Sequence, residues 1–87
     1  MASFRSNDEF FEAVAKLTAE LETHGHAGAV AELRSGFGCL NGLTDGWALF
    51  LESIDKVQAS QAERFDDNQR KALRAIRAAV YSAVYRR

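Results

Sequence analysis

Apolar residues recur three or four positions apart through most of the chain, which is the spacing of one face of an α-helix. In the first segment these residues are Phe10, Val14, Leu17 and Leu21. Ser6 can cap the segment, because Glu9 lies three residues later and can reach back to the same turn. Gly25 supplies the stop signal. The pattern therefore predicts an amphipathic helix over about 7–24.

The last segment has an equally regular pattern. Asp66 and Gln69 form a capping box, and Arg86 and Arg87 suit the negative end of a helix dipole. The apolar positions that follow the cap are Leu73, Ile76, Val80 and Val84. We expect a helix over about 67–86.

The middle of the chain supports two interpretations. The turn dipeptides Asn41-Gly42 and Asp45-Gly46, with Thr44 as a cap, predict two helices over 27–40 and 44–59. However, one stripe keeps its spacing of three and four across this point: Val30, Leu33, Phe37, Leu40, Thr44, Trp47, Leu51 and Ile54. An unbroken helix over 27–59 would show that regularity. We favour the break because the two dipeptides lie so close together.

A second face of this middle region carries mostly small residues. We assign to it Gly38, Gly42, Gly46, Leu49 and Ser53. Each glycine inside a helix costs about 1 kcal/mol relative to alanine, so glycines one turn apart need a compensating contact. Small residues let a second backbone approach closely, as they do in membrane helices. Leu49 within this face predicts that another helix packs there, from this chain or from a second copy.

Both interpretations give an all-α fold in a single domain, residues 1–87. Proline is absent, and no segment alternates apolar and polar residues as a half-buried strand does. A break at 41–45 gives an up-down four-helix bundle. A continuous helix, about 50 Å long, gives three helices with uncovered apolar surface that a homodimer would bury.

Charge is unevenly distributed although the net charge is only -1. Residues 1–62 hold four Lys or Arg and nine Asp or Glu, net -5, whereas residues 63–87 hold seven and three, net +4. The candidate basic face of the last helix consists of Arg70, Lys71, Arg74, Arg77 and Tyr81, and Tyr85 extends it. This face can bind nucleic acid or an acidic protein partner, or its arginines can pair with acids of the same bundle. We favour pairing over nucleic acid because the chain is not basic overall.

Two groups of acidic residues stand out: Asp8, Glu9 and Glu12 in the first helix, and Glu52 and Asp55 in the third. They superficially resemble the acidic pairs of all-α nucleoside triphosphate pyrophosphohydrolases. The resemblance implies a magnesium-dependent phosphohydrolase. The groups are far apart in sequence and point away from their apolar stripes, however, and a metal site needs ligands that converge. Solvated helix faces are therefore the favoured interpretation.

The remaining candidates for chemistry are His24, His26 and Cys39. Three such residues are too few for a closed structural zinc site, and a single cysteine excludes an internal disulfide. We interpret the histidines as turn residues and the cysteine as a small packing residue. We expect no cofactor.

The sequence thus predicts a small cytoplasmic, non-catalytic module that self-associates as a homodimer or docks another protein. A nucleic-acid-binding accessory protein and the phosphohydrolase are the alternatives. We expect no membrane association, because no apolar run approaches the ~18 residues of a spanning helix.

Overall fold

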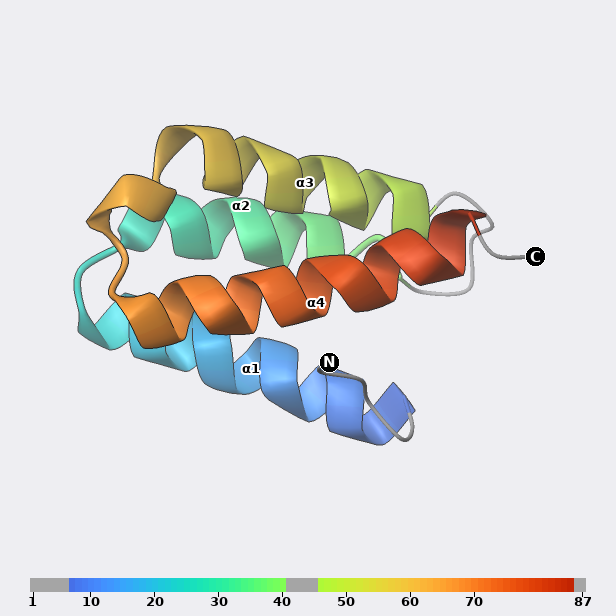
Figure 1. Cartoon of the computed structure of the whole chain (residues 1–87), viewed down its shortest axis with the longest axis horizontal. Coiled ribbons are helices and arrows are strands. Elements are labelled where there is room, and N and C mark those ends of the chain that lie inside the picture. The colour runs from blue at the N-terminus through green and yellow to red at the C-terminus, as the bar shows by residue number, and fades with distance from the viewer. Residues whose placement is uncertain (1–6, 41–45, 86–87) are drawn as a thin grey trace.

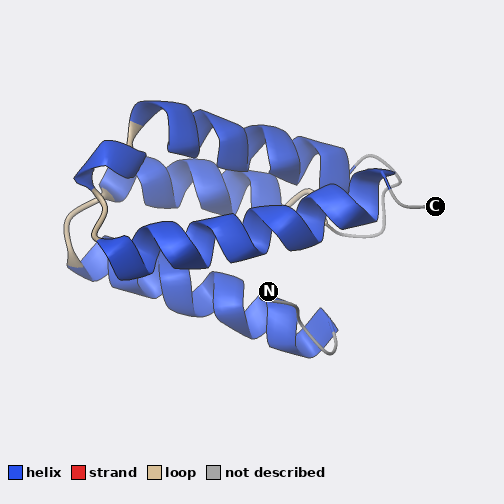
Figure 2. Ribbon diagram, viewed as in Figure 1, coloured by secondary structure: helices blue, strands red, loops and turns tan. Residues whose placement is uncertain are grey.

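The computed structural model describes residues 7–40 and 46–85, which form four α-helices and one 3-10 helix. The elements are α1 (Asn7–Thr23), α2 (Ala27–Phe37), α3 (Gly46–Ser60), η1 (Ala62–Arg64) and α4 (Asp67–Tyr85). Figure 1 shows successive helices running in opposite directions. Each packs on its neighbour in the chain, and α4 also packs on α1, which closes the bundle around one core. The all-α bundle is confirmed, and Figure 2 shows helices and connections in the described part, without a strand.

The alternative of one continuous helix over 27–59 is wrong. α2 ends at Phe37, and Gly38 follows with its N–H donating to the Arg34 carbonyl oxygen at 2.9 Å. α3 then returns alongside α2 (Figure 1). The apolar stripe keeps its phase through the break because both helices turn that stripe to the same core. Asn41, Gly42 and Thr44 lie outside the described residues.

The core is built from the apolar positions of all four helices. Its buried members include Phe10, Val14, Leu17, Leu21, Val30, Leu33, Phe50, Ile54, Val57, Phe65, Leu73, Ile76 and Val80. At one end of the bundle, the rings of Phe10, Phe11, Phe37, Trp47 and Phe50 contact one another at centroid distances of 5.5 to 6.4 Å. Trp47 is only partly buried and packs on the edge of this core.

The ends of α1 and α4 follow two signals read from the sequence. Gly25 has φ +82°, the left-handed conformation that a helix stop requires and that side chains disfavour. The Asp66 carboxylate accepts from the Gln69 N–H at 2.7 Å, and the Gln69 amide oxygen accepts from the Asp66 N–H at 3.0 Å. This is the predicted capping box. The Ser6 cap lies outside the described residues.

Gln69 also links the last helix of the bundle, α4, to the first, α1. Its side chain is 1% exposed, and its amide nitrogen donates to the Glu20 carboxylate at 3.4 Å. A buried amide needs its hydrogen bonds, so this contact fixes the position of α4 against the end of α1.

Candidate interaction surface

The small-residue face of the middle region packs largely within the chain. Ser53 and Gly46 are buried. A Cβ on Gly46 would collide with the carbonyl oxygen of Cys39. Leu49 remains 42% exposed, Gly38 is exposed, and Gly42 lies outside the described residues. The segment that precedes α3 therefore lies against Gly46, and Gly36 of α2 lies against Ser53.

Gly36 lies close against α3, and the sequence did not predict this contact. A Cβ on Gly36 would lie 2.6 Å from the Cβ of Ser53 and 3.1 Å from a ring carbon of Phe50. Gly36 belongs to the buried side of α2. Gly36 follows Leu33 of the apolar stripe by three residues, and this helical spacing could have placed it on the buried side of α2.

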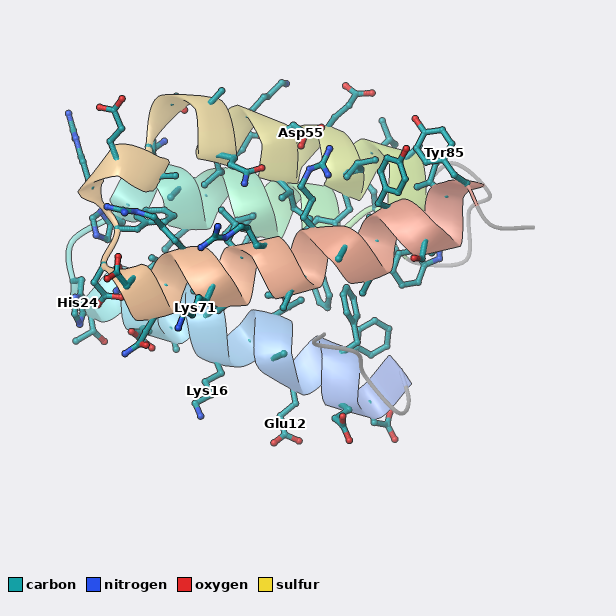
Figure 3. The ribbon with its side chains drawn as sticks, viewed as in Figure 1. Glu12, Lys16, His24, Asp55, Lys71 and Tyr85 are labelled. Carbon is teal, nitrogen blue, oxygen red and sulfur yellow. The ribbon has the colours of Figure 1, made fainter. Side chains whose placement is uncertain are left out.

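The basic residues of α4 form the second candidate surface. We call Arg70, Arg74, Arg77, Tyr81 and Tyr85 the arginine–tyrosine stripe. Steps of three and four residues place them on one side of the helix, because an α-helix has 3.6 residues per turn. In Figure 3, Asp55 points from α3 toward α4, and Tyr85 lies at the far end of the same side. The stripe thus follows the boundary between α3 and α4.

Arg77 is held at the middle of the stripe. Its Nε donates to the Asp55 carboxylate at 2.6 Å, and its guanidinium carbon lies 5.5 Å from the centroid of the Tyr81 ring. The hydrogen bond to Asp55 raises the pKa of Arg77 above its ordinary value, and this exceeds the lowering by burial. Arg77 therefore stays protonated, and its contribution to the ion pair would be lost only above the ordinary pKa of arginine.

The two tyrosines form the exposed end of the stripe. Tyr81 is 47% exposed and Tyr85 is 66% exposed. Their rings contact each other with centroids 4.5 Å apart and planes inclined by 41°. With Arg77 against Tyr81, this gives two aromatic rings and a guanidinium in one fixed group.

Arg70 lies at the other end of the stripe and is already bonded. Its Nε donates to the Ala62 carbonyl at 3.0 Å, and a terminal nitrogen donates to the Glu63 carbonyl at 3.4 Å. It also pairs with Asp67 at 3.5 Å. The pairing interpretation thus holds for Arg70 and Arg77, which bond to acids of the same chain.

Arg74 and Lys71 differ from these two arginines. Both are exposed, and neither forms an ion pair within residues 7–40 and 46–85. Arg74 borders a hollow of about 210 Å³ between α3, η1 and α4. The residues that line it are Gln58, Ala62, Arg70, Leu73 and Arg74. Arg70 and Arg74 were predicted from the sequence as surface candidates, but Gln58 was not.

The groups considered for metal binding lie apart. In Figure 3, Glu12 points outward from α1, whereas Asp55 faces α4. His26 packs its ring on Phe65 at 4.9 Å, and Cys39 lies beyond the opposite end of the 11-residue α2, about 16 Å along the helix. Across the described ranges, no three His, Cys, Asp or Glu residues come close enough to share a metal ion. The phosphohydrolase hypothesis stays a prediction.

Within the described part of the chain, every helix is too short or too polar to cross a membrane. No protein-family model, curated protein or solved structure matches the chain. The surfaces of the bundle are therefore the basis for inferring its function.

Proposed function

We propose that the chain is a non-catalytic protein-interaction module that binds a partner along the arginine–tyrosine stripe. The observation that carries this proposal is the exposed pair Tyr81 and Tyr85, with Arg77 held against it by Asp55. Tyrosine and arginine are enriched where protein interfaces concentrate their binding energy. Arg77 is already held by Asp55, so it loses less conformational entropy on binding.

The divergence of the candidate catalytic groups supports the non-catalytic part of the proposal. Glu12 and Glu52 are exposed on α1 and α3, two helices that do not adjoin in the ring of the bundle. Exposed carboxylates on separate helix faces have the geometry of solvated surface.

The test is a peptide selection against the immobilised chain, followed by fluorescence polarisation with the selected peptides. We expect the double variant Tyr81→Ser/Tyr85→Ser to weaken their binding by about tenfold or more, as truncation at the centre of an interface does. Leu49→Ser is the matched control because Leu49 is also a large exposed apolar residue, on α3. Circular dichroism would show that each variant keeps its helices.

Two results would contradict the proposal. One is equal binding of the selected peptides to the double variant and to the original chain. The other is loss of binding through Leu49→Ser alone, which would move the interface to the α2 side of α3.

The homodimer remains a proposal for how the module is organised. Gly46 and Ser53 are buried within the chain. Of the candidate residues that the structure describes, Gly38, Leu49 and the arginine–tyrosine stripe remain accessible to a second copy. Light scattering after size-exclusion chromatography measures the mass directly. A mass of one chain at all concentrations would exclude the homodimer while leaving a different protein partner possible.

Nucleic-acid binding is the second candidate function, because Arg74 and Lys71 form no ion pair among the described residues and the tyrosine rings offer stacking faces. We rank it second because Asp55 and Asp67 neutralise two arginines of the stripe. Arg74→Glu should abolish a salt-sensitive affinity for oligonucleotides. Absence of any affinity at low salt would end this hypothesis.

A further inference from the structure

We propose that the hollow between α3, η1 and α4 binds a carboxylate side chain of the partner, so that the partner segment is acidic. This inference depends on the proposed protein-interaction function and names the chemistry of the partner. It starts from the hollow of about 210 Å³, which is large enough for a side chain and opens beside the arginine–tyrosine stripe.

The donors around the hollow suit a carboxylate. Arg74 lines it and has no ion pair among the described residues, so its guanidinium is available. Gln58 lines the α3 side and can offer an amide N–H. A guanidinium binds a carboxylate through two parallel hydrogen bonds, which are stronger than bonds between neutral groups.

The hollow also has a preformed frame. Arg70 is fixed by the carbonyl oxygens of Ala62 and Glu63, at 3.0 and 3.4 Å, and thus forms one wall without needing a ligand. Leu73 is buried beneath and, with Ala62, supplies apolar surface. The methylene groups of an aspartate or glutamate would lie on that surface while the carboxylate meets Arg74.

Charge complementarity selects an acidic protein segment over nucleic acid. Residues 63–87 have a net charge of +4, which attracts an acidic partner. However, Asp67 and Asp55 stand beside Arg70 and Arg77. A nucleic-acid backbone presents closely spaced phosphates along its whole length and would meet both carboxylates. A peptide can place one carboxylate at Arg74 and neutral residues elsewhere.

The hollow and the tyrosine pair lie close enough for one partner segment to reach both. Arg74 and Tyr85 are eleven residues apart on α4, about 16 Å along the axis. One segment can therefore contact the hollow with an acidic side chain and the tyrosine pair with an apolar one.

The test is a nuclear magnetic resonance titration of the full chain, at low salt, with an acetylated and amidated peptide that carries one glutamate among neutral residues. We expect the resonances of the Gln58 side-chain amide and the Leu73 amide to shift. Arg74→Gln should weaken the interaction about fivefold, as loss of an exposed ion pair does. Lys16→Gln is the matched control, because it removes the same charge from α1, where Lys16 points away from α4 (Figure 3).

A peptide with glutamine in place of that glutamate is the control for charge, and an oligothymidylate of similar length tests nucleic acid. The inference would be overturned if the glutamate peptide failed to shift Gln58 and Leu73, if the glutamine peptide shifted them equally, or if Lys16→Gln and Arg74→Gln weakened binding equally. Stronger binding of the oligothymidylate at Arg74 would overturn it in favour of nucleic acid. Selected peptides that need Tyr81 but contain no acidic residue would refute the carboxylate site alone and leave the interaction function intact.

Discussion

Helix α3 meets its two neighbours in different ways. On the α2 side, Gly36 lies against Ser53 and leaves no room for a larger side chain. On the α4 side, Asp55 reaches across to Arg77, and a hollow opens beside Gln58. Small residues have thus brought α2 close, whereas long polar side chains form an accessible surface with α4. The α2 side of α3 is therefore closely packed, whereas the α4 side keeps the exposed polar surface to which we propose that the partner binds.

The largest effect should come from Gly46→Ala. The added Cβ would meet the backbone carbonyl of Cys39, which cannot rotate away as a side chain can. We expect the free energy of unfolding to fall by about 2 to 3 kcal/mol, as overpacking of a tight contact does. Urea unfolding followed by circular dichroism measures the change. An unchanged midpoint would show that the segment before α3 moves at little cost.

Gly36→Ala should have the next largest effect. Its Cβ would lie 2.6 Å from the Ser53 Cβ, and the clash is partly offset because alanine favours the helix by about 1 kcal/mol. We expect a net loss of about 1 to 2 kcal/mol. Adding Ser53→Gly removes the Ser53 atoms that collide with the new Cβ. The double variant should therefore lose less stability than the sum of the losses of the two single variants.

Gly38→Ala is the matched control for Gly36→Ala. Gly38 lies two residues later, at the C-cap of α2, and among the described residues a Cβ there would meet only the carbonyl oxygens of Arg34 and Ser35 at 3.4 and 3.5 Å. We expect this substitution to be neutral or to stabilise by up to about 1 kcal/mol. Equal losses at both positions would mean that the α2–α3 contact is not tighter than the helix end.

The helix caps and the core were predictable from the sequence, whereas the contact between α2 and α3 was not. The caps were predictable because Gly25 and the pair Asp66 and Gln69 act within a single turn. The core stripes were predictable because helical periodicity assigns each residue to a face. The approach of Gly36 to Ser53 was not, since it depends on the rotation of α2 relative to α3. Small residues alone signalled a close neighbour but did not tell which one.

The surface with α4 was predictable in part. Spacing identified the arginine–tyrosine stripe and placed Asp55 outside its own apolar stripe. The pairing of Asp55 with Arg77 required the register between two helices. Gln58 lies three residues after Asp55, and Arg74 three before Arg77, as antiparallel helices require. Knowledge of the Asp55–Arg77 pair would therefore have predicted that Gln58 and Arg74 face each other across the hollow.

Tyr81→Ser should destabilise the fold less than Gly46→Ala or Gly36→Ala. Tyr81 is half exposed, so its loss removes mainly the ring contact with Tyr85 and the contact with Arg77. We expect a decrease of about 0.5 to 1 kcal/mol in the free energy of unfolding. A loss as large as that of Gly46→Ala would show that the tyrosine supports the fold, which would weaken its assignment as a binding residue.

The smallest effect should be the coupling between Arg77 and Asp55. A double-mutant cycle with Arg77→Gln and Asp55→Asn isolates this pair, whose side chains are 35% and 48% exposed. Solvent screens such a pair, so we expect a coupling of about 0.5 kcal/mol or less that declines as salt is added. A coupling insensitive to salt would indicate that packing, rather than charge, joins α3 to α4. In that case both sides of α3 would be joined to their neighbours by packing, and the reason for placing the binding surface on the α4 side would be removed.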